Sequence, residues 1–196
     1  FDYGISLDKR DRVYAPTDGY YTSFNQGVPI YADTPYLKNA WSYSQYQSLS
    51  PDFIGTFKVF ASAINGLSGH DVRLSKRLNI GGSRLRGFEA GKVGPKDGID
   101  YVGGNYAMAT NFELALPNFL PENTKTDVGL FLDVGNVWGV DYDATVDDSN
   151  KIRSSTGVAA TWLSPVGPMS FILAQSLSKA SSDVTETFNF RLGTTF

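Results

Sequence analysis

Apolar and polar side chains alternate strictly at the end of this sequence, in residues 186–196. One parity is mostly aromatic or aliphatic, and the other is polar or small. The first set is Phe188, Phe190, Leu192, Thr194 and Phe196, and the second is Asn189, Arg191, Gly193 and Thr195. Because successive side chains of a β-strand point to opposite faces, we predict a strand with a different environment on each side.

The same alternation recurs along the chain, roughly once every 20 residues, which is the spacing of strands in outer-membrane barrels. It is clear in 54–63, 105–116, 127–138 and 152–162, and weaker in 3–13, 19–30, 40–49 and 169–177. With the final segment this predicts about nine strands. No segment carries a helical apolar stripe, and none approaches the ~18 consecutive apolar residues of a transmembrane helix. The predicted fold class is therefore all-β.

The composition of the two faces separates a membrane barrel from a soluble sandwich. Only 19% of the residues are charged, and the polar parities hold mostly Gly, Ala, Ser, Thr and Asn. A sandwich usually places more charge on its outer face. A membrane barrel is apolar outside and polar inside. We predict an antiparallel transmembrane β-barrel; in the alternative, a soluble sandwich, the Phe188 face would be buried in a core.

Short and long connections are predicted to alternate between the strands, which would assign each set to one rim of the barrel. The short set is 16–19, 50–52, 117–126 and 164–168, and the long set is 30–39, 65–104, 139–151 and 179–185. Segment 65–104 is about 40 residues long and lacks a strong strand pattern. A connection of that length inside a compact domain usually has a function or is disordered.

Several motifs in and after this segment resemble the outer-membrane assembly-factor superfamily. Arg86-Gly87-Phe88, after Gly-Gly-Ser at 81–83, is similar to the Arg-Gly-Phe/Tyr motif of the family's long inward loop, and Gly-Pro-Lys-Asp at 94–97 is similar to its BamA branch. Residues 131–138 resemble its aspartate-bearing strand and 111–114 its glutamate-bearing strand. Phe196 matches its terminal aromatic residue, and the resemblance covers about 11–196.

The resemblance implies a sixteen-stranded barrel preceded by periplasmic polypeptide-transport-associated domains. Counted back from Phe196, about nine strands would make residues 1–196 the C-terminal part of such a barrel domain, with the inward loop at about 65–104 and the periplasmic domains absent from this chain. An open sheet edge in lipid would leave backbone groups unpaired at a cost of several kcal/mol each. We therefore interpret the chain as part of a longer protein.

Arg86, Glu113 and Asp133 are the first candidate site. Strand parity places both carboxylates on the lumen side of neighbouring strands. A guanidinium between two carboxylates relieves their repulsion through paired hydrogen bonds. Gly87 would let the backbone turn, and Phe88 would anchor the loop by burying its ring. The resemblance implies that the loop enters the lumen and that its arginine meets these acids. In the alternative, Arg86 is a solvated loop residue.

The last strand is the second candidate site, formed by Phe188, Phe190, Leu192, Gly193 and Phe196. A glycine inside a strand weakens its pairing and permits bending, although an ordinary strand glycine is the plainer interpretation. The resemblance implies that first and last strands meet at a lateral seam that accepts a substrate strand, and that Phe196 directs the protein's own assembly.

Residues for enzyme chemistry are sparse. The chain has no cysteine, one histidine (His70) and a net charge of -3, which gives no reason to expect nucleic acid. The acidic segment after residue 140 lacks the glycine and glutamate of an EF-hand, so an acidic surface loop is the favoured interpretation there. We predict no catalytic residue, no metal and no cofactor.

Two functions remain open. The first is an assembly factor of the bacterial outer membrane, which folds and inserts β-barrel proteins by strand templating. Its partners would be nascent outer-membrane β-barrel proteins, assembly-complex lipoproteins and membrane lipid. The second is a secretion or translocation pore of the same superfamily, or a passive porin. Because a secretion pore would share the Arg-Gly-Phe loop, that motif does not separate the two.

Overall fold

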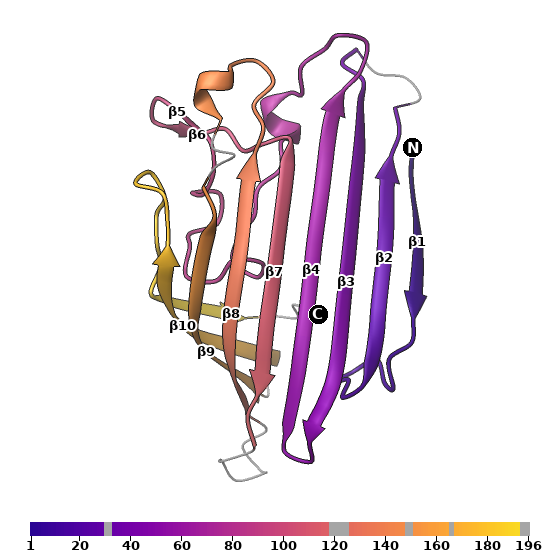
Figure 1. The fold of residues 1–196 in the computed structure, drawn as a ribbon, viewed down its shortest axis with the longest axis vertical. Helices are drawn as coiled ribbons and strands as arrows, with labels where there is room; N and C mark the ends of the chain where they lie inside the picture. Colours follow the sequence, from indigo (N-terminus) through magenta and orange to yellow (C-terminus); the bar gives the residue numbers. More distant parts are fainter. Residues whose placement is uncertain (30–32, 118–125, 148–150, 165–166, 193–196) are drawn as a thin grey trace.

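The computed structural model describes residues 1–29, 33–117, 126–147, 151–164 and 167–192. Within these residues, nine strands form one antiparallel sheet in the order β1-β2-β3-β4-β7-β8-β9-β10-β11 (Figure 1). They are β1 (Asp2–Asp8), β2 (Gly19–Gly27), β3 (Tyr36–Ser50), β4 (Phe53–Gly66), β7 (Tyr106–Ala115), β8 (Thr126–Trp138), β9 (Arg153–Ser164), β10 (Gly167–Ser178) and β11 (Phe188–Leu192). Each strand therefore pairs with its neighbour along the chain, which is a meander.

Every predicted strand is present in this sheet, but some bounds differ. β1 ends at Asp8, five residues before its predicted end, because Asp11 closes a turn by accepting the backbone N–H groups of Thr17 and Asp18. β3 begins at Tyr36, four residues before its predicted start, and pairs there with Gly66 of β4. Backbone pairing continues at that end although the alternation of side chains has ended, so hydropathy alone placed the boundary too late.

The two faces of the sheet differ as the alternation predicted. The Phe188, Phe190 and Leu192 side chains of β11 are 54%, 45% and 60% exposed. Exposed apolar side chains continue across the same face on Met108, Phe112, Leu130, Leu132, Val158, Trp162, Phe171 and Leu173. No second sheet covers this face within the described ranges, so the sandwich alternative is wrong. We call this face the outer face.

Residues 67–105, which join β4 to β7, lie against the opposite, inner face and are here called the inward loop. The loop contains a two-stranded ribbon, β5 (Lys96–Asp97) with β6 (Asp100–Tyr101), and a 3-10 turn at Leu74–Lys76. The alternation did not predict the ribbon. A second 3-10 turn follows β8 at Ala144–Val146, and no helix in the described part of the chain is long and apolar enough to cross a membrane.

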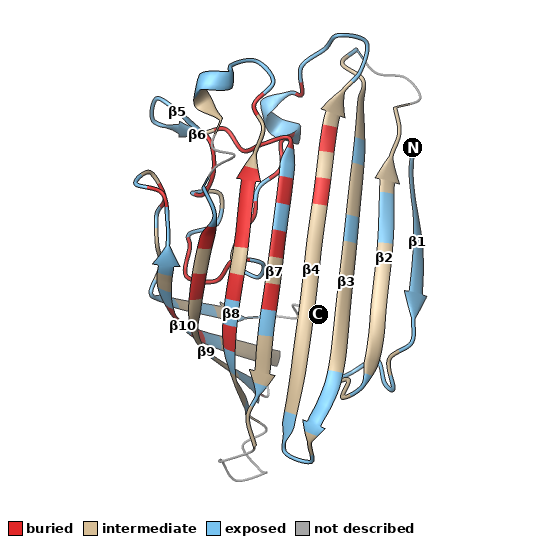
Figure 2. Cartoon of the chain, viewed as in Figure 1, coloured by how far each residue is buried: buried red, intermediate tan, exposed pale blue. Residues whose placement is uncertain are grey.

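The main apolar core lies between the inward loop and strands β4, β7 and β8. Its buried members are Ile64, Val72, Leu78, Ile80, Leu85, Phe88, Val93, Ala107 and Val137. Buried positions gather over β7 to β9 and the loop, whereas β1 to β3 are largely intermediate or exposed (Figure 2). Because each large apolar side chain contributes about 1.5–3 kcal/mol on burial, this core holds the loop in the interior.

The orientation of the outer face gives a test of its lipid contact. We expect Leu132→Arg, at the middle of β8, to destabilise the protein by about 2–4 kcal/mol, since a charge at the midplane of a bilayer is costly. Leu49→Arg, next to the end of β3, should cost roughly 0–1 kcal/mol. Urea unfolding of the full protein in lipid vesicles measures both. Equal costs for the two variants would contradict a lipid-facing outer surface.

Candidate functional site

Arg86 makes three hydrogen bonds to one carboxylate, that of Asp133 on β8. The Arg86 backbone N–H donates to Oδ2 at 2.9 Å, Nε donates to Oδ2 at 2.8 Å, and Nη2 donates to Oδ1 at 2.7 Å. The Arg86 side chain is 9% exposed and that of Asp133 is fully buried. The guanidinium fork thus meets the carboxylate in the bidentate geometry that gives charge-assisted pairs their strength.

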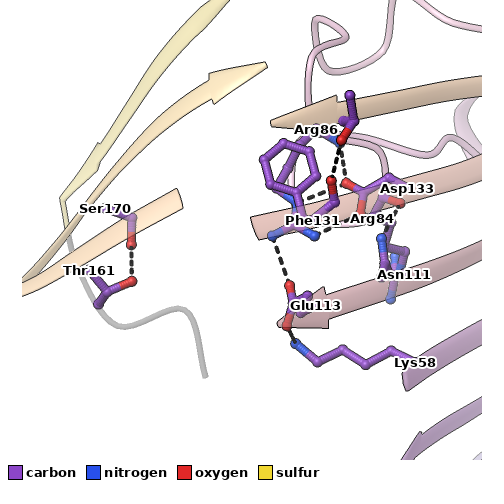
Figure 3. Close-up of polar contacts among 10 residues, drawn as sticks. Lys58, Arg84, Arg86, Asn111, Glu113, Phe131, Asp133, Thr161 and Ser170 are labelled. Atoms are coloured by element: carbon purple, nitrogen blue, oxygen red, sulfur yellow. Dashed lines mark hydrogen bonds and ion pairs between the residues drawn. The ribbon is translucent and has the colours of Figure 1, made fainter. Parts of the chain in front are cut away.

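Glu113 and Lys58 extend this pair into a chain of alternating charges (Figure 3). Arg86 Nη1 lies 2.7 Å from Glu113 Oε1, and Lys58 Nζ donates to Glu113 Oε2 at 2.8 Å. The order along the chain of contacts is Asp133, Arg86, Glu113 and Lys58, with two positive and two negative groups. We call these four residues the latch.

A row of three side chains holds the backbone of the loop tip above the latch. Asn111, Asp133 and Ser155 are directly opposite one another on β7, β8 and β9. Asn111 Nδ2 donates to the Arg84 carbonyl at 2.9 Å, Asp133 accepts the Arg86 N–H, and the Ser155 hydroxyl donates to the Arg86 carbonyl. Three adjacent strands therefore fix three backbone groups of Arg84 and Arg86, which sets the position of residues 84–86.

Aromatic rings on the inner face lie against two arginines of the loop, Arg84 and Arg86. The Arg86 guanidinium carbon is 3.8 Å from the centre of the Phe131 ring, and that of Arg84 is 3.5 Å from the centre of the Phe60 ring. Phe131 in turn lies over Gly157, where an added Cβ would come within 2.9 Å of the ring. These cation–π contacts stabilise each arginine by about 0.5–2 kcal/mol.

Gly87 and Phe88 follow Arg86 in the loop motif. Gly87 has a φ of +84°, which L residues rarely adopt, and an added Cβ would lie 3.0 Å from the Ala174 Cβ. The Phe88 side chain belongs to the main apolar core and is 1% exposed. The turn at Gly87 thus allows Arg86 to meet the carboxylates while the next ring enters the core.

The structure brings Arg86, Glu113 and Asp133 together, and the alternative of a solvated Arg86 is wrong. Gly87 follows at the turn, and Phe88 lies in the apolar core. Phe188, Phe190 and Leu192 lie elsewhere, on the outer face of β11. Gly193 and Phe196 fall outside the described residues. Sequence reasoning missed Lys58, Asn111 and Ser155. Lys58 left a signal, because it is a lone cation on the lumen parity of its strand, but Asn111 and Ser155 are ordinary polar strand residues.

The acidic segment after β8 is tied to the inward loop at the rim of the sheet. The Asp141 carboxylate pairs with Arg77, and its Oδ2 accepts the Val72 N–H at 2.8 Å and Asn105 Nδ2 at 3.0 Å. Burial raises the pKa of Asp141, but these donors outweigh it and hold the pKa below its usual value. No group of three or more potential metal ligands gathers within the described ranges.

The arrangement of these side chains serves to position the tip of the inward loop. Each latch residue has an oppositely charged partner within 2.8 Å, and the loop tip is fixed by both side-chain and backbone contacts. Removing one member of a buried pair typically costs about 3–5 kcal/mol, because it leaves a charge without compensation. These contacts tie the loop tip to the inner face of β7 and β8.

Comparisons with known proteins agree with the fold. The Omp85 superfamily domain matches residues 1–196. The chain is 29% identical over 99% of its length to the outer membrane protein assembly factor BamA of Neorickettsia risticii and 30% identical over 98% to that of Neisseria meningitidis. It covers 27% and 28% of those two proteins, about a quarter of their length.

A eukaryotic relative and a solved structure are also similar to the chain. A SAM50-like protein of Schizosaccharomyces pombe is 30% identical over 59% of the chain, which covers 26% of that protein. The crystal structure of BamA from Haemophilus ducreyi lacking POTRA domains 1-3 superposes with a TM-score of 0.86 at 27% identity. That superposition covers 96% of this chain and 41% of the other.

Alanine variants of two loop glycines distinguish the effect of backbone strain from that of close side-chain packing. Gly87→Ala should destabilise the loop by more than the ~1–2 kcal/mol of a left-handed alanine, because its Cβ also meets Ala174 and Ser155. Gly91 has a φ of +74° and no atom near an added Cβ, so Gly91→Ala reports the strain alone. Limited proteolysis of the loop measures the difference. Equal sensitivity of the two variants would show that close packing at Gly87 is unimportant.

The lowered pKa of Asp141 predicts a pH dependence at the rim. A carboxyl group with a depressed folded pKa stabilises above its unfolded pKa of about 4, and loses that contribution as pH falls through the folded value. Exchange of the Val72 amide hydrogen should therefore accelerate below about pH 4 relative to the intrinsic rate. In Asp141→Asn the acceleration should be absent. An identical pH profile in the variant would contradict this role.

Proposed function

Because the chain belongs to the Omp85 superfamily, we propose that it is the C-terminal part of the barrel of an outer-membrane protein assembly factor. Such a factor folds β-barrel proteins and inserts them into the bacterial outer membrane. Periplasmic domains would precede this part in the whole protein. The partners are nascent outer-membrane β-barrel proteins, lipoproteins of an assembly complex, and membrane lipid.

The observation that carries the proposal is the combination of a latched loop with a strand, β11, at the edge of the sheet. Within the described residues, β11 pairs with β10 from Met169–Leu192 to Leu173–Phe188. A strand at an edge presents N–H and C=O groups that can pair with an incoming chain. Templating of a substrate strand at this edge needs no cofactor and no covalent step.

The latch supports such a role by fixing one wall of the lumen. Arg86 and Asp133 tie the loop to β8, and Glu113 ties it to β7. Strands β9 to β11 follow β8 to one edge of the sheet, so they have a fixed neighbour against which their pairing can change. A secretion pore would instead require the lumen to conduct, which gives the second candidate a distinct signature.

Reversing the latch charge tests the proposal. We expect Arg86→Glu in the full protein to slow assembly of a reporter β-barrel about tenfold or more and to make the inward loop protease-sensitive, since three carboxylates would then face one another. Arg12→Ala, which removes an exposed arginine of the β1–β2 connection, is the matched control and should leave both unchanged. Normal assembly and unchanged proteolysis in Arg86→Glu would refute the role of the latch.

Reconstitution separates the two functions. Vesicles that contain the full protein and its complex should accelerate the folding of an added unfolded β-barrel protein. A secretion pore or porin would instead give a large, voltage-dependent conductance with no acceleration. That second result would replace the assembly proposal with the pore.

A further inference from the structure

The connection between β10 and β11, residues 179–187, runs alongside the inward loop. Backbone N–H groups of Glu89 and Glu186 donate to the carbonyls of Val184 and Gly87, both at 3.0 Å. The Val184 N–H donates to the Lys92 carbonyl at 3.2 Å. These bonds form a short antiparallel ribbon centred on the pair Phe88 and Thr185. The inward loop therefore pairs directly with the segment that leads into the terminal strand.

A buried ion pair holds this connection from the other side. Arg153, the first residue of β9, donates from Nε to Asp183 Oδ2 at 2.8 Å and from Nη2 to Asp183 Oδ1 at 2.9 Å. Both side chains are fully buried. Asp183 Oδ2 also accepts the Ala180 N–H at 2.6 Å, and Arg153 donates to the Asn136 side-chain carbonyl. This pair is separate from the latch, whose side chains contact β4, β7 and β8.

The placement of this pair fixes where the terminal strand begins. Asp183 closes a turn with Ala180 and lies directly before the ribbon residues 184–186. The Thr187 carbonyl then accepts the Ala174 N–H of β10 at 2.8 Å, and β11 starts at the next residue. A buried charge that loses its partner is strongly unfavourable, so Arg153 and Asp183 each require the other in this position.

We propose that Arg153 is a positioning residue, which fixes residues 179–187 on the inward loop so that the loop and the start of β11 behave as one body. Movement of β11 away from β10 would then begin at the end of the strand remote from residue 187. The role of the anchored β11 strand in assembly rests on the proposed function. The anchoring of residues 179–187 does not depend on the proposed function, and it is tested without an assembly assay.

A pair of cysteines reports the docking directly. Glu89 and Val184 are opposite each other in the ribbon, Val184 is 38% exposed, and residues 1–196 contain no native cysteine. In the full protein in its membrane, Glu89→Cys with Val184→Cys should form a disulfide rapidly. Adding Arg153→Met should slow disulfide formation about tenfold or more. Removing one partner of a buried ion pair costs more free energy than a tenfold change corresponds to.

Conservative and partner variants separate positioning from general loss of structure. Arg153→Lys keeps the charge and should recover part of the rate, whereas Asp183→Asn should slow it as Arg153→Met does. Arg12→Ala should leave it unchanged. Heat-modifiable mobility on gels confirms that each variant is folded. An unchanged disulfide rate in both folded Arg153→Met and folded Asp183→Asn overturns the proposal.

The same cysteines connect the anchoring to function. If Arg153→Met slows assembly of a reporter barrel, the oxidised tether should restore it and reduction should remove the gain. A slow disulfide together with assembly that the tether fails to restore overturns the coupling. If Arg153→Met slows the disulfide in a protein that shows no assembly activity, the proposed function fails while the anchoring stands.

Discussion

A buried arginine between two carboxylates determines how the interior of this sheet is organised. Arg86 would be costly to bury alone, and it is stable there because Asp133 and Glu113 neutralise it and the Phe131 ring supports its lower face. The rest of the loop follows from that placement: Gly87 turns the chain, and Phe88 enters the apolar core. The inner face of the sheet over β7 to β9 is thus covered by a packed layer whose charges are compensated.

Apolar and polar contacts contribute differently to the placement of the inward loop. The apolar core around Ile64, Leu85 and Val137 supplies burial that depends little on orientation. The row formed by Asn111, Asp133 and Ser155 supplies direction, since each member bonds a particular backbone group of residues 84–86. Packing therefore keeps the loop inside, and the polar row decides which residue reaches the carboxylates.

Strand positions and strand faces could be predicted from the sequence, because the alternation of apolar and polar side chains involves only neighbouring residues. The parity that placed Glu113 and Asp133 on the inner face was correct, and the family resemblance added Arg86. Contacts that depend on register between strands could not be read in this way. Lys58 and Glu113 are 55 residues apart and Arg153 and Asp183 are 30 apart, and no local pattern relates either pair. The early end of β1 at Asp8 was missed because a side-chain turn at Asp11, rather than hydropathy, ends the pairing.

The low exposure of Arg86 and Asp133 also determines how the latch responds to ionic strength. Mobile counterions screen charges that they can approach, over a Debye length of about 8 Å at physiological salt, and they approach buried groups poorly. The exposed pair of Arg12 and Asp11 at the β1–β2 connection is open to such screening, whereas the Arg86–Asp133 pair is enclosed by protein. The interior of the sheet therefore keeps its electrostatic order in dilute and in concentrated electrolyte alike, while the surface pairs weaken as the medium becomes more saline.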